Sequence, residues 1–154
     1  MDTCLKASNV AAHILRVARD KRIAVDNLKL QKLLYYAQAW HLALYESPLF
    51  SGEIEAWVHG PVVPEVFRQY RHLRWSEIVS PAVEPEPILS PNALEHIGKI
   101  VDEFGRFSGP QLERMTHAES PWLLARAGTP PDEASAEVIS PETMAVFYKQ
   151  VASE

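Results

Sequence analysis

Residues 27–46 read NLKLQKLLYYAQAWHLALYE, and this segment decides the fold. At about 100° per residue, its bulky apolar side chains fall within one wide arc, with His41 at the edge of that arc. The arc holds Leu30, Leu33, Leu34, Ala37, Trp40 and Leu44. Asp26 or Asn27 can cap the helix at its start. A helix with so broad an apolar face is predicted to lie at the centre of a mainly α fold.

The opposite arc of this helix carries Gln31, Lys32, Tyr35, Gln38, Leu42 and Glu46. Tyr35 and Leu42 are costly choices for a face that meets only water. Two interpretations stay open at this point. Either this side is exposed and meets a partner protein, or a later helix of the same chain covers it.

Working outward, the pattern predicts several shorter elements. Residues 8–20 form a helix with Ser8 as its N-cap, and residues 53–58 alternate as a short strand. Further helices begin at Pro64, at the Ser-Pro pairs of residues 90–91, 120–121 and 140–141, and at the capping box of residues 108–111. Residues 76–90, rich in proline, form an extended connection. The prediction is a compact multi-helix domain of residues 1–154, with a core of about 8–150, a short frayed N-terminus and at most a small β element.

Composition narrows the class of protein. The chain has 154 residues, of which 47% are hydrophobic and 23% charged, as is usual for one soluble globular domain. No apolar run approaches the ~18–20 residues of a membrane span, and the N-terminus lacks the pattern of a secretory signal. Cys4 is the only cysteine, which rules out an internal disulfide and a multi-cysteine zinc site. We therefore expect a cytoplasmic protein with no membrane partner.

The net charge of −5 argues against a nucleic-acid partner and favours a basic protein as partner. A basic group at Arg16, Arg19, Lys21 and Arg22 is better interpreted as a solvated helix end. An autorepressor that binds its own promoter stays open as an alternative, although no basic recognition helix supports it.

Six histidines raise the question of catalysis or metal binding. None forms a His-x-x-x-His or Glu-x-x-His pair, and no phosphate-binding loop occurs, so neither a metal nor a cofactor is predicted. His117 and Glu119 could act as the acid–base pair of a metal-dependent hydrolase. The stronger interpretation places both in a buried turn where they bond to the backbone.

The segment around Trp57 is a second candidate for a specific structural or binding role. Gly60 follows a predicted strand, where glycine commonly supplies a backbone angle that other residues resist, and Pro61 fixes the exit. Trp57 lies on the glutamate-bearing side of this strand. It is predicted to be either half-buried or an exposed anchor for a partner.

These stretches resemble, in order, the blocks of the Panacea domain. The first block is KLQKLLYYAQ (29–38) with WHLA (40–43), and the second is PLF (48–50), EAW (55–57) and GPVVPEV (60–66). The third is THAESPW (116–122), and ISPE (139–142) resembles the start of the closing helix. The blocks extend over about residues 8–150, with one small departure at Phe67, where the family pattern has tyrosine.

The resemblance implies a small bacterial antitoxin, of a family associated with phages and mobile elements, that binds a toxin encoded beside it and is not an enzyme. Its SocA-like branch implies a proteolytic adaptor that presents the toxin to the protease ClpXP; steric neutralisation alone is the alternative. We expect the partner to contact Gln31, Tyr35, Gln38, Trp57, His59, Gly60, Pro61 and Val62. We expect a structural role for Leu33, Leu34, Trp40, His41, His117, Glu119, Pro121 and Trp122.

Overall fold

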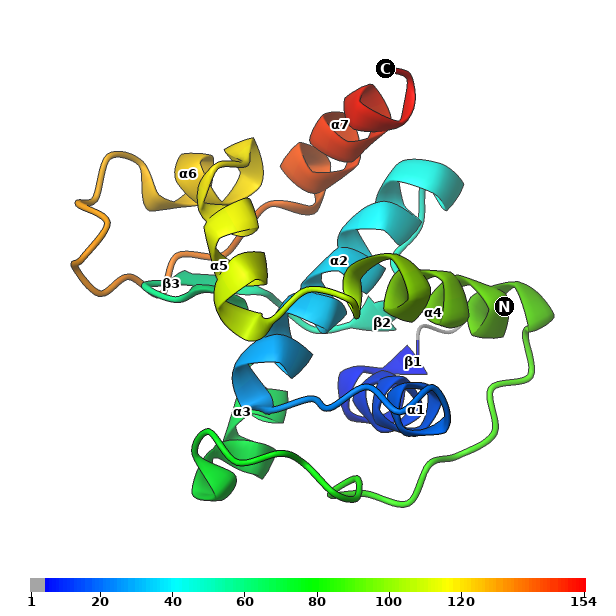
Figure 1. Cartoon of the computed structure of the whole chain (residues 1–154). Coiled ribbons are helices and arrows are strands. Elements are labelled where there is room, and N and C mark those ends of the chain that lie inside the picture. Colours follow the sequence, from blue (N-terminus) through cyan, green and yellow to red (C-terminus); the bar gives the residue numbers. More distant parts are fainter. Residues whose placement is uncertain (1–4) are drawn as a thin grey trace.

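The computed structural model describes residues 5–154 and contains, in that range, seven α-helices and two small two-stranded sheets (Figure 1). The helices are α1 (Ala7–Asp20), α2 (Asn27–Tyr45), α3 (Pro64–Tyr70), α4 (Pro91–Phe104), α5 (Gly109–His117), α6 (Ser120–Arg126) and α7 (Pro141–Ala152), with a 3-10 turn at Arg71–Leu73. Strand β1 (Leu5–Lys6) pairs in parallel with β2 (Phe50–Ser51), and β3 (Glu55–Trp57) pairs antiparallel with β4 (Gly60–Val62). The predicted mainly α class is confirmed. The frayed end was predicted for residues that lie outside the described range.

Helix α2 passes through the middle of the molecule and contacts α1, α3, α4, α5 and α7 (Figure 1). Leu30, Leu33 and Leu34 have no exposed surface, as expected for the apolar arc of a central helix. Leu44 departs from the prediction, because it lies in the last turn of α2 and is exposed. The fold is therefore built around one helix, which other elements surround.

The opposite arc of α2 is also buried, except for Glu46. The interpretation that a later helix covers it holds for Tyr35 but not for Gln31, Lys32 and Gln38, which bond to strands and turns. Tyr35 and Leu42 lie in the core, and α7 packs along α2 (Figure 1). The hydroxyl groups of Tyr35 and Tyr148 are 2.9 Å apart, which ties α2 to α7. A buried phenol needs such a partner, and α7 supplies it.

Helix starts follow the predicted capping residues in four cases, the first being Asp26, whose carboxylate accepts from the backbone N–H of Lys29 in α2. The Ser90 and Ser140 hydroxyls accept hydrogen bonds from the backbone of the first turns of α4 and α7, and a proline follows each serine. Ser108 and Gln111 form a reciprocal capping box at α5. These contacts satisfy backbone N–H groups that a helix start leaves free.

Two predicted N-caps are wrong. Helix α1 begins one residue before Ser8, after Lys6, which provides no side-chain cap. Helix α6 begins at Ser120 itself, with Glu119 in the extended N-cap position. The Glu119 carboxylate does not cap α6 because it accepts hydrogen bonds from two tyrosines instead.

The long connection between α3 and α4 is extended, as predicted, and α1 holds its second half. Asn9 exchanges two hydrogen bonds with the backbone of Glu86, at 3.1 and 2.8 Å, and His13 Nε2 lies 2.7 Å from the same carbonyl oxygen. These side chains satisfy the backbone of a segment without regular structure. Within residues 5–154, no helix has the length and apolarity needed to cross a membrane.

Candidate functional site

The β3–β4 hairpin carries the residues around Trp57. Its strands pair Trp57 with Gly60, so the turn consists of Val58 and His59. Gly60 has φ +103°, and a Cβ there would lie 2.7 Å from Lys32 Cε and 2.9 Å from Thr116 Oγ1. Backbone angle and packing therefore both require glycine at this position. The sequence pattern predicted one strand here, and the second strand was missed.

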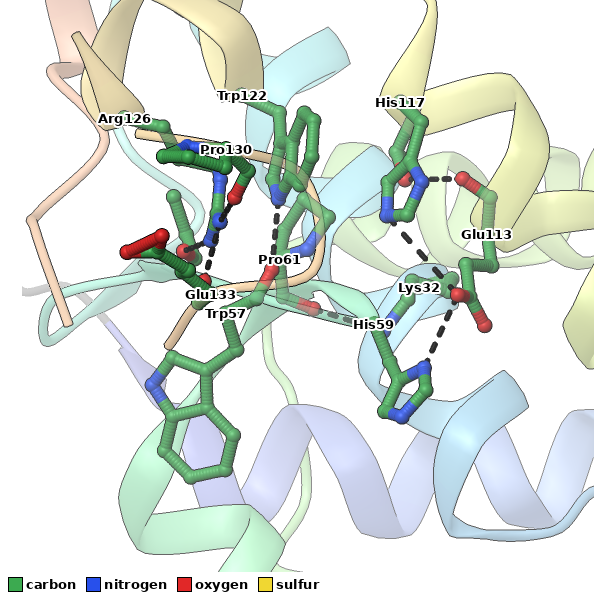
Figure 2. A network of polar contacts seen from close by, with 12 residues as sticks. Lys32, Trp57, His59, Pro61, Glu113, His117, Trp122, Arg126, Pro130 and Glu133 are labelled. Atoms are coloured by element: carbon green, nitrogen blue, oxygen red, sulfur yellow. Dashed lines mark hydrogen bonds and ion pairs between the residues drawn. The ribbon is translucent and has the colours of Figure 1, made fainter. Parts of the chain in front are cut away.

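Trp122 and Arg126 of α6 hold the hairpin in place (Figure 2). The Trp122 indole donates a hydrogen bond to the carbonyl of Trp57 at 2.8 Å. Arg126, which is buried, donates to the carbonyl of Ala56 at 3.0 Å and to two carbonyls of the loop after α6. Its guanidinium lies 4.7 Å from the Trp122 ring centroid, a cation–π distance. The hairpin is thereby fixed to α6 through its backbone.

A charged cluster adjoins the hairpin turn, where Glu113 of α5 faces two histidines (Figure 2). Glu113 Oε2 lies 3.0 Å from His59 Nδ1 and 4.0 Å from His117 Nε2. Lys32 of α2, which has no exposed surface, donates from Nζ to the carbonyl of Pro61 at 3.1 Å. Burial lowers the pKa of Lys32 to about 7, although the nearby Glu113 carboxylate acts in the opposite direction. A buried amine thus titrates near neutral pH in this fold.

We expect the free energy of unfolding to rise by about 2 kcal/mol between pH 7 and pH 9 because of Lys32. The lysine in the unfolded chain stays protonated over this range, whereas the folded one loses its proton above about 7. The unfolded state then binds more protons, so raising the pH favours the folded state. Denaturant unfolding at pH 7, 8 and 9 measures this, with Lys32→Met as the control that should lack the rise. Parallel profiles for the two proteins would contradict the assignment.

A groove of about 460 Å³ opens beside the hairpin, and we call it the Trp57 groove. Its lining includes Leu28, Trp57, His59, Phe67 and Trp75, together with residues 134–136 of the loop before α7. The half-buried Trp57 ring meets Phe67 edge-on with centroids 5.1 Å apart, and its indole donates to Glu55 at 2.7 Å. Trp75 is 66% exposed. Partly exposed tryptophans in an apolar groove are typical anchor points of protein interfaces.

Only Trp57 and His59 of the eight residues predicted to bind a partner keep exposed surface. The other six, Gln31, Tyr35, Gln38, Gly60, Pro61 and Val62, are buried. The prediction of an exposed side of α2 is therefore wrong for Gln31, Tyr35 and Gln38. For Trp57 and His59, contact with a partner remains a prediction.

The two glutamines are buried because they satisfy the backbone of neighbouring turns. Gln31 Oε1 accepts from the backbone N–H of Val63 at 2.9 Å. Gln38 accepts from the N–H of Leu49 at 2.7 Å and donates to the carbonyl of Phe50 at 2.8 Å. An amide group can meet a backbone donor and a backbone acceptor at once, which no apolar side chain can do.

The residues expected to have a structural role lie in or at the edge of the core. Leu33, Leu34, Pro121 and Trp122 are buried, whereas Trp40, His41, His117 and Glu119 are partly buried. His41 Nδ1 lies 2.6 Å from the carbonyl oxygen of Ser47. The Trp40 indole nitrogen is buried and has no hydrogen-bond partner among the described residues.

His117 and Glu119, the pair of the hydrolase alternative, have different partners. The His117 ring stacks on Trp122 with centroids 4.0 Å apart, and burial lowers its pKa. Glu119 Oε1 accepts hydrogen bonds from Tyr36 at 2.8 Å and from Tyr148 at 2.7 Å, and burial raises its pKa. Within the described residues, no hydrogen bond or ion pair joins the two side chains. Over residues 5–154, no three His, Cys, Asp or Glu side chains gather in a group that could hold a metal ion.

Sequence reasoning missed four residues of this region. Trp75 lies between Arg74 and Ser76 in the sequence, and this polar surrounding could have marked it as a surface aromatic. Lys32 and Glu113 come together only through the packing of α5 on α2. Nothing in the local pattern distinguishes the buried Arg126 from a solvated arginine.

Comparison with known proteins supports the resemblance to the Panacea domain. The family model described as "Antitoxin SocA-like, Panacea domain" matches residues 30–123, from the first turn of α2 to the middle of α6. Antitoxin SocA of Caulobacter vibrioides (strain NA1000 / CB15N) is 35% identical over 133 residues, which cover 79% of this chain and 71% of that protein. No solved structure shows a significant match. The chain therefore belongs to the SocA-like antitoxin family with a Panacea domain.

Proposed function

We propose that this protein is an antitoxin that neutralises a toxin by binding it, and that the Trp57 groove takes part in the contact. Membership of the SocA-like antitoxin family carries the proposal. The groove supports it, because Trp57 and Trp75 offer partly exposed aromatic surface beside a rigidly held hairpin. A stable complex of this kind typically buries about 1,600 Å² in total.

The proposed toxin is a basic protein. The net charge of −5 would favour encounter with a positively charged partner. We propose the cytoplasm as the place of action, since the single cysteine fits a reducing compartment. In this proposal residues 1–154 work as one binding unit with no catalytic step.

The finer proposal is that the protein acts as a proteolytic adaptor and presents the bound toxin to ClpXP. Similarity to the SocA-like branch supports it. An adaptor needs one surface for the toxin and another for the unfoldase ClpX. The alternative is neutralisation by steric block, for which a single surface is sufficient.

Co-expression with the product of the adjacent gene, tagged on one partner only, tests the proposal. We expect the two proteins to purify together. Addition of ClpX, ClpP and ATP should then shorten the half-life of the toxin several-fold compared with the toxin alone. A stable complex without faster degradation would replace the adaptor mechanism with steric neutralisation. Failure to form a complex with either neighbouring gene product would contradict the antitoxin proposal itself.

A further inference from the structure

A second groove, of about 440 Å³, is lined mainly by residues of α2, α4 and α7. We call it the Glu119 groove. Its lining includes Tyr36, Trp40, Phe104, Glu119 and Tyr148. Neither the family comparison nor the proposed toxin contact at Trp57 assigns a role to this groove. The partly buried Trp40, Phe104 and Glu119 therefore share a concave surface of unassigned function, with the buried Tyr36 and Tyr148 beneath it.

Hydrogen bonds to one oxygen hold the Glu119 carboxylate in place, while its other oxygen accepts none from the described residues. Both tyrosine hydroxyls, from Tyr36 and Tyr148, donate to the same oxygen, Oε1. Tyr35 extends the network through its contact with the Tyr148 hydroxyl. No hydrogen bond or ion pair reaches the second oxygen, Oε2, from any residue of the described range. A carboxylate that is held rigidly and lacks a cation is a ready acceptor for a charged donor.

The walls of the groove favour a flat organic cation. Phe104 stacks on the buried Tyr36 ring with centroids 4.2 Å apart and ring planes 4° from parallel, and of the two rings Phe104 keeps exposed surface. Trp40, which is partly exposed, packs against the buried Tyr148 with centroids 5.4 Å apart. Aromatic faces attract cations, and the planar, weakly hydrated guanidinium of arginine stacks on such rings more readily than a lysine ammonium.

The other charged groups of the groove leave this acceptor available. Glu103 already pairs with Arg106 at 3.1 Å, and Lys99 lies exposed on the same helix, α4. His96 is buried, and burial lowers its pKa, so it adds no positive charge at neutral pH. Burial raises the pKa of Glu119, as expected for a carboxyl group with no cation beside it.

We propose that the Glu119 groove receives an arginine side chain of the partner protein, with the guanidinium on Glu119 Oε2 and its plane along the aromatic wall. The inference rests on the proposed function in one respect, namely that the arginine belongs to the toxin. The Glu119 groove would then be a second contact region besides the Trp57 groove. It would also identify one carboxylate, that of Glu119, at which a basic partner is recognised.

The groove itself is tested on the isolated protein with a capped arginine, N-acetyl-arginine-methylamide. We expect the NMR signal of the Trp40 indole N–H to shift in a saturable manner. The capped citrulline analogue, which has nearly the same shape but no charge, should bind at least ten-fold more weakly. Equal shifts for arginine and citrulline would overturn the proposal. This comparison needs no variant and is therefore independent of folding effects.

Glu119→Gln provides the matched variant, because glutamine Oε1 can still accept both tyrosine hydrogen bonds while the negative charge is lost. Its affinity for the capped arginine should fall at least ten-fold. Glu95→Gln, which removes an exposed charge of α4 outside the groove lining, should leave the affinity within two-fold of the original. If the two variants lost affinity equally, the effect would be general charge and not a site at Glu119.

The complex with the adjacent gene product separates this inference from the proposed function. If the complex forms and Glu119→Gln weakens it at least ten-fold, the arginine comes from the partner. If the complex forms with unchanged affinity, the inference fails while the antitoxin proposal stands. If no complex forms with the original protein, the antitoxin proposal fails, and with it the assignment of the arginine to a toxin.

Discussion

The Gly60→Ala variant is expected to lose about 3–4 kcal/mol of unfolding free energy. Alanine at φ +103° is strained, and its Cβ would lie 2.7 Å from Lys32 Cε and 2.9 Å from Thr116 Oγ1. Lys32 has no exposed surface and donates to the Pro61 carbonyl, so its side chain has little room to move aside. Urea denaturation followed by circular dichroism measures the loss.

Alanine variants of two other glycines distinguish the cost of backbone strain from the cost of steric crowding. Gly128 has φ +85° but open space around its Cα, so Gly128→Ala should cost only about 1–2 kcal/mol from strain. Gly98 lies inside α4 with open space, and Gly98→Ala should stabilise the protein by about 0.5–1 kcal/mol. If Gly60→Ala cost no more than Gly128→Ala, the close packing of the hairpin on α2 and α5 would be wrong.

The Arg126→Ala variant is expected to lose about 3 kcal/mol of unfolding free energy. Arg126 is 2% exposed and donates to the carbonyls of Ala56, Pro130 and Glu133. Its removal leaves these acceptors without a donor and takes away the cation–π contact with Trp122. Thermal and urea unfolding both report the change.

Arginine geometry, and not charge alone, should be responsible for this loss. Arg126→Lys keeps the charge but cannot reach three carbonyls at once, so we expect it to recover less than half of the lost stability. Arg16, exposed on α1, serves as the control, because Arg16→Ala should change stability by less than about 0.5 kcal/mol. If Arg126→Ala left the free energy of unfolding unchanged, α6 would not hold the hairpin in place.

Local patterns were sufficient to predict most helices. The apolar arc of residues 27–46 fixed α2 as the centre, and serine followed by proline marked the starts of α4 and α7. These signals are local: a capping serine bonds to N–H groups only two or three residues further along. Glu119 shows the limit, because its carboxylate reaches tyrosines of α2 and α7 instead of capping α6.

The candidate site could be predicted only in part. Trp57 was identified from the sequence, but the same reasoning placed Gln31 and Gln38 on an exposed face. Helical periodicity tells which side chains share a face, and it cannot tell what covers that face. The side-chain amides of these glutamines form hydrogen bonds with backbone groups 11 to 32 residues further along the chain. These hydrogen bonds exist only in the folded chain.

The measurement that tests the central claim most directly is titration calorimetry of the adjacent gene product into this protein and its Trp75→Ser variant. Trp75 is 66% exposed, so the substitution should change stability by less than about 0.5 kcal/mol. Leu89→Ser, at a position 89% exposed, is the matched control outside the Trp57 groove. We expect a tight complex with the original protein and with Leu89→Ser, and at least ten-fold weaker binding with Trp75→Ser. Equal affinities for Trp75→Ser and the original protein would contradict the role of the groove, and no binding at all would contradict the antitoxin function.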